Sequence, residues 1–423
     1  MADDLNFRKR KTEEGKEKNA KKVRTDSKKK PGFDKEKFQE TEYYIKDGLR
    51  HVKPYPFTFT TYCKGRWLRR KILDVLSQEF QAKTIEYYRK AIQTGNITVN
   101  GNHVNEDSIL KDNDVICHKV HRHEPPVTAV PIQVISETED LVVVNKPSSI
   151  PIHPCGRYRH NTLVFLLGRE FGYTNLHTIH RIDRLTSGIV MFAKSKEKAQ
   201  QLEKQLREHE LQKEYVCKVQ GEFPSDKIDC CEPIGVISHK IGVCRVHGDG
   251  KSCRTVFTRE SFDGTNSIVK CRPSTGRMHQ IRVHLQWLGY PIIDDPIYNH
   301  EAWGPGKGKG GVSEEIAFKI IESLTTSLQN NDVDLNSKSN SEESSEDCTK
   351  LQEPTVSAAS TNQEDWKQTK VPGCTECQIQ QCDPTPAELT MCLHAAVYKG
   401  PDWEYRCPWP DWALPTVDAQ KTN

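Results

Sequence analysis

The chain has 423 residues, of which 35% are hydrophobic and 28% are charged, and its formal net charge is +3. This composition is too polar for a chain that folds along its whole length, so we expect some segments to be solvated and disordered. No apolar run approaches the length of a transmembrane helix, and the N-terminus lacks the apolar core of a secretory signal, which argues against a membrane-spanning or secreted protein. The fifteen cysteines are then interpreted as reduced thiols of the cytosol or nucleus.

The N-terminal segment, residues 1–40, is rich in lysine and poor in apolar residues, which predicts a disordered basic tail. Its two basic clusters, residues 8–11 and 21–24, are typical of a nuclear localisation signal and equally of a tail that binds RNA phosphates. Acidic residues such as Asp3 and Glu13 argue against a mitochondrial presequence. We therefore expect a protein of the nucleus, the cytoplasm or both.

Residues 62–120 have the pattern of a small RNA-binding domain. Apolar residues recur at helical spacing over 67–80, a second helix is predicted over 84–93, and a strand from Ile97 leads into an Asn-Gly turn before a last strand at 115–118. This order resembles the alpha-L fold of ribosomal proteins. On its first helix, four basic residues are expected either to contact phosphates or to form a solvated helix face: Arg66, Arg69, Arg70 and Lys71.

A larger domain is expected over residues 130–303, after a proline-rich linker. Apolar runs predict strands at 132–135, 141–144, 188–193, 215–219 and 267–271, and helices at 196–211 and 277–288. The helices do not alternate regularly with the strands. This order predicts an α+β fold with a mixed or antiparallel sheet rather than a parallel one.

An insertion over residues 304–385 interrupts this domain, which is expected to resume over 386–415. Residues 329–365 carry Asn, Ser and Glu with almost no large apolar groups, so we expect the insertion to be largely disordered. A short amphipathic helix is predicted within it at 313–328.

The most informative segment is 180–188, which reads His-Arg-Ile-Asp-Arg-Leu-Thr-Ser-Gly and precedes an apolar strand. Asp183 lies between Arg181 and Arg184 on a loop held at the end of that strand. Neighbouring cations lower the pKa of a carboxyl group, and an ionised, positioned aspartate can act as a nucleophile. From spacing alone, an Asp–Arg ion pair that closes a turn is the more ordinary interpretation.

This segment resembles the signature of the RluA-type pseudouridine synthases, in which the aspartate is catalytic. Four further segments resemble family motifs in the same order: 141–154, 213–221, 275–298 and 393–395. The resemblance implies a core with a bent mixed sheet and a cleft across its middle. It also implies the isomerisation of uridine in RNA to pseudouridine without a cofactor.

The resemblance implies three catalytic residues. Asp183 would be the nucleophile, Arg282 would form a bidentate ion pair with it, and Tyr215 would stack against the target ring. The alternative for Tyr215 is an ordinary core aromatic of a strand.

Five further residues are expected to contact the RNA or to support the loop. Arg181 would fill the space left by a flipped-out uridine, and His180 would brace the loop more than transfer protons. The remaining three expected substrate contacts are Arg184, Arg277 and His279. The partner is RNA, either transfer RNA, messenger RNA or both, and the likeness is to the eukaryotic nuclear and cytosolic branch.

Three rival interpretations remain at this point. A non-catalytic RNA-binding protein would need the basic tail and the small domain alone. A zinc deaminase would need H-x-E with P-C-x-x-C, and the segment 372–377 lacks both the spacing and the partner. A structural zinc site is the third alternative, against free thiols, and its four ligands would be Cys374, Cys377, Cys382 and Cys392.

Overall fold

The structure, a computed structural model, describes residues 35–80, 83–238, 241–331, 371, 374, 376–378 and 383–414. Residues 1–34 of the predicted tail (1–40) and residues 332–365 of the predicted disordered stretch (329–365) lie outside these residues. The disorder predicted for the end of the tail is wrong, because residues 35–38 form a helix and the Phe38 side chain is buried. None of the helices in the described part of the chain is long and apolar enough to cross a membrane.

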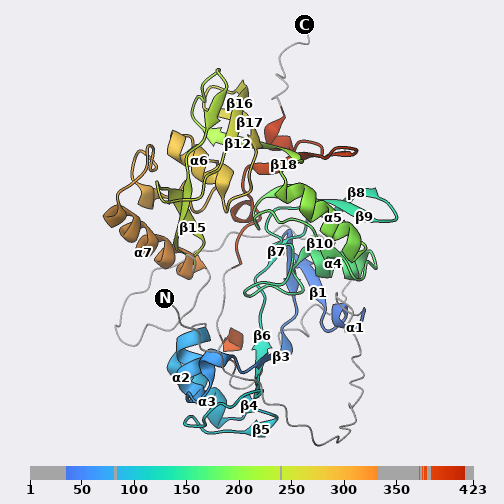
Figure 1. Ribbon diagram of the computed structural model, residues 1–423, viewed down its shortest axis with the longest axis vertical. Coiled ribbons are helices and arrows are strands. Elements are labelled where there is room, and N and C mark those ends of the chain that lie inside the picture. Colours follow the sequence, from blue (N-terminus) through green and yellow to red (C-terminus); the bar gives the residue numbers. More distant parts are fainter. Residues whose placement is uncertain are drawn as a thin grey trace, which may run out of the picture. The chain divides into compact units, whose positions relative to one another are not determined.

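The small domain is a four-stranded antiparallel sheet with two helices (Figure 1). Its strands follow the order β3 (Tyr55–Tyr62), β6 (Val115–Arg122), β4 (Ile97–Val99) and β5 (Asn102–His103). Helices α2 (Ile72–Val75) and α3 (Ile85–Gln93) pack their buried side chains around Trp67. Asn100 and Gly101 both have positive φ, as the tight turn between β4 and β5 requires.

The four basic residues assigned to the first helix are not on it. They precede α2, because Arg66 belongs to a single 3₁₀ turn (Gly65–Trp67) and Arg69 has a positive φ of 61°. Arg66 and Arg70 are both paired with Glu79. The predicted basic helix face is therefore wrong, since the chain turns sharply where regular helical spacing was assumed.

The large domain is built on one mixed sheet, which confirms the predicted α+β class. Its strands follow the order β13 (Ile228–Cys230), β16 (Thr255–Phe262), β17 (Asn266–Pro273), β12 (Gln212–Gln220), β18 (Leu393–Lys399), β11 (Ser187–Ala193), β9 (Leu141–Lys146) and β8 (Gln133–Glu137). Two short strands extend it, β10 (His177–Thr178) beside β11 and β19 (Glu404–Arg406) beside β18. The domain's helices are α4 (Leu163–Glu170), α5 (Lys196–Arg207) and α6 (Gln280–Leu288).

The strand that follows the insertion, β18, occupies the middle of this sheet. It pairs antiparallel with β12 on one side and parallel with β11 on the other. Ser187 faces His394 across the parallel pair, and the Ser187 hydroxyl and His394 Nδ1 lie 2.9 Å apart. The segment that carries Asp183 therefore leads into a strand fixed on both sides.

Smaller elements complete the fold. A three-stranded sheet consists of β1 (Tyr43–Lys46), β2 (Leu49–Val52) and β7 (Val127–Thr128). A separate hairpin consists of β14 (Ile234–Ser238) and β15 (Val243–Val246). The short helix α1 (Lys35–Phe38) packs against α4.

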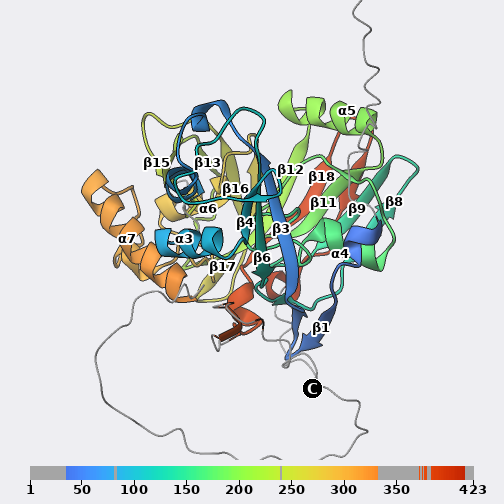
Figure 2. The same cartoon turned by 90° about the horizontal axis from the view of Figure 1, so that it is seen from below.

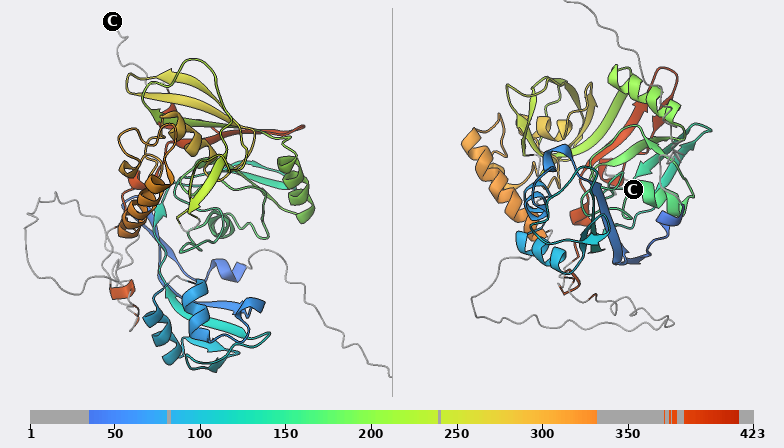
Figure 3. Two further views of the ribbon diagram at one scale, coloured as in Figure 1. Left: turned by 60° about the vertical axis from the view of Figure 1, so that its left-hand side comes forward. Right: turned by 60° about the horizontal axis from the view of Figure 1, so that its bottom comes forward.

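The first part of the insertion is folded, unlike the expectation of a largely disordered segment. Helix α7 (Glu314–Asn331) confirms the helix predicted over 313–328, although it begins one residue later and continues to Asn331. Its Ile320 and Leu324 are buried in a cluster with Val243 of β15 and Trp303, and Figures 2 and 3 show α7 beside that hairpin. Burial of these apolar residues offsets the entropy cost of ordering the helix.

The glycine at the start of β11 yields a stability prediction. Gly188 has a φ of +106°, and a Cβ there would lie 2.3 Å from the Ala395 carbonyl oxygen of β18. We expect Gly188→Ala to destabilise the fold by more than roughly 2 kcal/mol, through overpacking and backbone strain together. Gly65→Ala is the matched control, since nothing lies within 4 Å of its added Cβ. Equal unfolding midpoints of the two variants in urea would contradict this prediction.

Candidate active site

Asp183 lies on a short loop between β10 and β11 whose ends are anchored in the core. Ile182 and Leu185 are buried, and the Thr186 amide donates a hydrogen bond to the Asp183 carbonyl at 3.2 Å. A hydrogen bond from the core also holds the loop: the buried Lys146 ammonium donates to the Arg184 carbonyl at 3.0 Å. The Asp183 side chain remains 29% exposed, so a ligand can reach its carboxylate.

Arg282 is the partner of Asp183, although not in the predicted geometry. Its Nη1 donates one hydrogen bond to Asp183 Oδ2 at 2.9 Å. The bidentate pair is instead with Asp295, where Nε and Nη2 donate to the two carboxylate oxygens at 2.7 and 2.8 Å. The predicted bidentate Asp183–Arg282 pair is wrong, because Asp295 approaches the same guanidinium from the opposite edge and leaves one nitrogen for Asp183.

The charges in the row Asp183–Arg282–Asp295 keep Asp183 ionised. Burial alone would raise the pKa of Asp183, but His279 and Arg282 outweigh it and hold the pKa below its usual value. Burial also lowers the pKa of His279 to about 4, so this imidazole is neutral at neutral pH. The side chain beside Asp183 that stays positively charged at neutral pH is therefore Arg282. Its own pKa is raised by Asp295, against the effect of burial.

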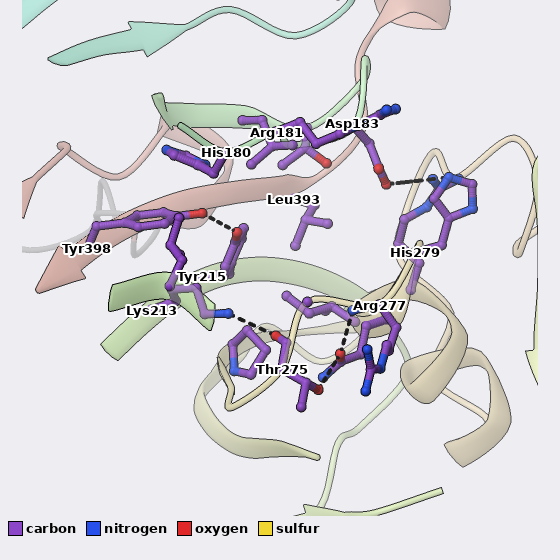
Figure 4. A pocket seen from close by; sticks show the side chains of 18 of the residues that line it. His180, Arg181, Asp183, Lys213, Tyr215, Thr275, Arg277, His279, Leu393 and Tyr398 are labelled. Carbon is purple, nitrogen blue, oxygen red and sulfur yellow. Dashed lines mark hydrogen bonds and ion pairs between the residues drawn. The ribbon is translucent and has the colours of Figure 1, made fainter. Parts of the chain in front are cut away.

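His279 is held in one orientation beside the carboxylate. It has a positive φ of 55° at the N-terminus of α6, and its Nδ1 lies 2.9 Å from the Tyr298 hydroxyl. Its Nε2 is 3.7 Å from Asp183 Oδ2, which is longer than a hydrogen bond. Figure 4 shows Asp183 and His279 pointing toward one another.

Aromatic side chains form the other side of the pocket (Figure 4). The hydroxyls of Tyr215 and Tyr398 lie 2.6 Å apart, and burial raises the pKa of Tyr215 to about 12, so its phenol is neutral. Tyr215 is 9% exposed and is a member of the hydrophobic core as well as of the pocket lining. Tyr215 is therefore a core aromatic, as the alternative interpretation expects, and it also lines the pocket, while its stacking on a target ring stays a prediction.

His180 lies against this aromatic side. Its ring is stacked on Tyr398 with centroids 4.7 Å apart, and its Nε2 accepts a hydrogen bond from the Met191 amide. These contacts fix the ring, as a bracing role requires. Nδ1, which then carries the proton, is buried without a partner among the described residues.

The structure brings seven of the eight sequence-predicted site residues into the lining of one pocket of about 440 Å³. They are Asp183, Tyr215, Arg282, His180, Arg181, Arg277 and His279. Arg184 is the exception, because its side chain turns away and its guanidinium lies 5.6 Å from the centre of the Tyr158 ring. Successive residues of the loop point in different directions, which the spacing alone did not reveal.

The pocket rim is basic. Arg181 is exposed, and Arg277 is held by two hydrogen bonds from its guanidinium to the Ser252 carbonyl. Lys213 also lines the pocket, donates to the Thr275 carbonyl at 2.9 Å, and has its pKa lowered to about 8 by burial. Cations at a pocket mouth are suited to RNA phosphates.

Sequence reasoning assigned no role to four residues that shape this pocket: Lys146, Asp295, Tyr398 and Lys213. Lys146, Lys213 and Asp295 belong to segments that resembled family motifs, so their positions were marked, but their partners were not. Tyr398 lies beyond the closing motif, and its place beside Tyr215 depends on the pairing of β12 with β18.

The four-cysteine metal set is wrong. Cys392 is not grouped with Cys374 and Cys377, and its Sγ lies 3.9 Å from an Asp294 carboxylate oxygen. Cys382 lies outside the described residues. The irregular spacing of these cysteines in the sequence does not indicate which of them lie close together in the folded chain.

Comparison with known proteins identifies both domains. The family model described as RNA pseudouridylate synthase matches residues 140–287, and the model described as S4 domain matches residues 70–116. The human protein named pseudouridylate synthase RPUSD2 is 46% identical over 416 residues, covering 90% of this chain and 76% of its own length. The chain belongs to the RNA pseudouridylate synthase family.

Two relatives from Saccharomyces cerevisiae are named for a substrate. The tRNA pseudouridine(32) synthase, mitochondrial, is 39% identical and covers 89% of this chain and 79% of its own length. The tRNA pseudouridine(31) synthase is 31% identical and covers 61% of this chain and 74% of its own length.

This pseudouridine synthase is thus an isomerase with an S4 RNA-binding domain, and the non-catalytic interpretation is excluded. The expected location in nucleus or cytoplasm is contradicted by the first of these yeast relatives, which is named as mitochondrial. The physical reason is that a basic, polar segment serves nuclear import, RNA binding and mitochondrial import alike. A few acidic residues such as Asp3 did not decide among them.

The position of Arg282 between two carboxylates predicts that its removal lowers the free energy of unfolding. Arg282→Met would leave the fully buried Asp295 side chain without its cation, so we expect a loss of about 3–5 kcal/mol in the free energy of unfolding. Single-turnover activity should fall strongly as well, because Asp183 loses its cation. Arg277→Met, which removes an exposed arginine of the same pocket, should change the stability far less. Similar urea midpoints for the two variants would rule out the buried pair as a determinant of stability.

The neutral histidines predict a pH dependence. Burial lowers the pKa of His279 to about 4 and that of His180 to about 3, whereas both rings titrate near 6.5 in the unfolded chain. The unfolded chain therefore binds more protons, and stability should fall as the pH drops from 6.5 toward 4, by up to about 1.4 kcal/mol per pH unit for each ring. His279→Gln should make this slope shallower, as urea titrations at pH 6.5, 5.5 and 4.5 would show. An unchanged slope would mean that His279 is not buried as a neutral ring.

Proposed function

We propose that this chain converts a uridine of transfer RNA to pseudouridine, with Asp183 as the nucleophile and without a cofactor. The observation that carries the proposal is the ionised carboxylate of Asp183, held by Arg282, which lines the same pocket as the ring of Tyr215. The pocket volume of about 440 Å³ is within the range of small-ligand sites and suits one nucleoside.

The chemistry requires few groups. The bond from C1′ to N1 breaks, a bond from C1′ to C5 forms, N1 gains a proton and C5 loses one, so no electrons are gained or lost. Asp183 can attack C1′, take the C2′ proton or add to C6 of the base. All three routes need the carboxylate ionised, and the Arg282 cation supplies that condition.

The detached base must be held while it turns. A neutral aromatic wall suits this task, because stacking on Tyr215 tolerates rotation of the base better than directed hydrogen bonds do. His180 braces this wall, since its ring is stacked on Tyr398. His279, neutral and fixed by Tyr298, is a group for the polar edge of the base.

The target uridine must first leave its RNA stack. Arg181 is exposed on the pocket rim two residues before Asp183, and we assign it to the vacated space. Arg277 and Lys213 on the same rim are assigned to the flanking phosphates.

Transfer RNA is the substrate that the relatives favour. Two of them are named for tRNA, at positions 32 and 31, and neither is named for messenger RNA. We propose uridine 31 or 32 as the target, and, on the name of the first of them, mitochondria as the location. Subcellular fractionation of the tagged chain tests the location, and a tag confined to other fractions would refute it.

The substrate is tested with tRNA transcripts that carry cytidine in place of uridine at position 31, at position 32 or at both. Product should form on the unmodified transcript and be absent from the double replacement. Pseudouridine formed at an equal rate on the doubly replaced transcript would overturn the choice of position without affecting the role of Asp183.

Asp183→Asn should yield no detectable pseudouridine, because the amide is neutral and a poor nucleophile. Tritium release from C5-labelled RNA measures turnover, and filter binding measures RNA affinity, which we expect to stay within about threefold of wild type because phosphate contacts dominate it. Asp226→Asn, an exposed aspartate, is the control. Turnover by Asp183→Asn near the wild-type rate would exclude Asp183 as the nucleophile.

A further inference from the structure

A cluster of two histidines and two cysteines lies outside the catalytic pocket. His121 is the second-last residue of strand β6 and His123 follows directly after the strand, so the alternation of side chains places both rings on one face. Cys374 and Cys377 come from the far side of the insertion, 251 residues after His123 in the case of Cys374, and Cys377 lies in a short 3₁₀ turn (Glu376–Gln378).

The four ligand atoms converge. The Cys377 Sγ is 3.2 Å from His121 Nδ1 and 3.4 Å from His123 Nε2, the Cys374 Sγ is 3.6 Å from His123 Nε2, and the two ring nitrogens are 3.1 Å apart. All four atoms lie within 4.8 Å of one another. Four atoms around one zinc ion, with zinc–nitrogen bonds of about 2.0 Å and zinc–sulfur bonds of about 2.3 Å, would be separated by roughly 3.3–3.8 Å.

We propose that these four residues bind one structural Zn²⁺ ion in a Cys₂His₂ site. Two thiolates and two imidazoles are a ligand set that zinc favours, and the Cys-x-x-Cys spacing is typical of half of such a site. Two thiolates also balance the charge of the ion, so a half-buried site needs no further anion. Four protein ligands complete a tetrahedron, and this leaves no open position for water or substrate.

The residues around the cluster support a structural role. Glu376, between the two cysteines, accepts a hydrogen bond from Lys83 at 3.1 Å and is paired with Arg157 at 3.6 Å. It thereby ties the turn that carries the cysteines to two other segments.

Glu124, next to His123, is not available as a proton-transfer group. It accepts hydrogen bonds from the Tyr55 hydroxyl and from three consecutive backbone amides of residues 159–161. A hydrolytic metal centre needs both a free carboxylate and an open metal position, and this cluster offers neither.

The ion would fix where the chain returns after the insertion. Cys377 precedes the segment that leads into β18, the strand at the centre of the catalytic sheet. A metal clip that closes so long a loop restricts the unfolded chain strongly. The insertion can then vary in composition without altering the path into β18.

The test measures metal content and coordination in the full-length chain. The protein is expressed in zinc-supplemented medium, purified without chelators and analysed by mass spectrometry of its metals. We expect about one zinc per chain. Cys374→Ser, Cys377→Ser, His121→Asn and His123→Asn should each lower that content at least roughly fivefold, since a site with three ligands holds zinc less tightly. Cys382→Ser, Cys392→Ser and the exposed Cys231→Ser should keep it.

Cobalt provides a readout that does not depend on whether a variant folds. Wild-type chain stripped of zinc and titrated with Co²⁺ should develop the visible absorption of a tetrahedral site and a thiolate-to-cobalt charge-transfer band, both reversed by added Zn²⁺. Three results would overturn the proposal: wild-type protein with neither zinc nor tetrahedral cobalt, a Cys374–Cys377 disulfide in freshly purified protein, or full zinc retention after both cysteines are replaced by serine.

Discussion

The row Asp183–Arg282–Asp295 is the interaction on which the active site depends. One guanidinium serves two carboxylates, with two hydrogen bonds to the buried Asp295 and one to Asp183. The division is asymmetric for a physical reason. Asp295 also accepts hydrogen bonds from the backbone amides of Ile297 and Tyr298, so its position is fixed. Asp295 thereby holds Arg282, and Arg282 in turn holds the Asp183 carboxylate that faces the pocket. A lone aspartate at this depth would tend to take up a proton, whereas a carboxylate beside a buried, permanently charged guanidinium stays ionised.

The mixed sheet brings Asp183 and Arg282 together from distant parts of the chain. Asp183 enters from the loop before β11, and Arg282 lies on α6, which follows β17 at the other side of the sheet. Between them, β18 joins β11 to β12 and brings Tyr398 to Tyr215. The close parallel contact at Gly188 sets the position of the Asp183 loop, because only a residue without a Cβ allows β18 to approach. The insertion before β18 is tolerated because the entropic cost of closing a loop grows only slowly with its length, while the pairing with β11 and β12 fixes the strand itself.

The S4 domain and the proposed zinc site concern RNA binding and the path of the chain rather than chemistry. The basic residues before α2 are largely paired, Arg66 and Arg70 with Glu79 and Lys71 with Asp107, so their charge is oriented by neighbours. Strand β6 contains His121 of the metal cluster, and His123 follows directly after its last residue. One strand thus contributes both to the S4 sheet and to the clip that would hold the chain after its insertion.

The sequence by itself determined the family, the α+β class, most strands of the large sheet and seven of the eight residues expected in the pocket. It could do so because catalytic residues lie in short contiguous motifs, and because strand and helix periodicity is a local property. Only the tertiary structure decided which groups touch. The bidentate partner of Arg282 proved to be Asp295, Arg184 turned toward Tyr158, and Cys374 and Cys377 met two histidines rather than two cysteines. Each of these outcomes depends on a contact between segments far apart in the chain. Such contacts follow from strand order and side-chain direction, which the spacing of residue types does not encode.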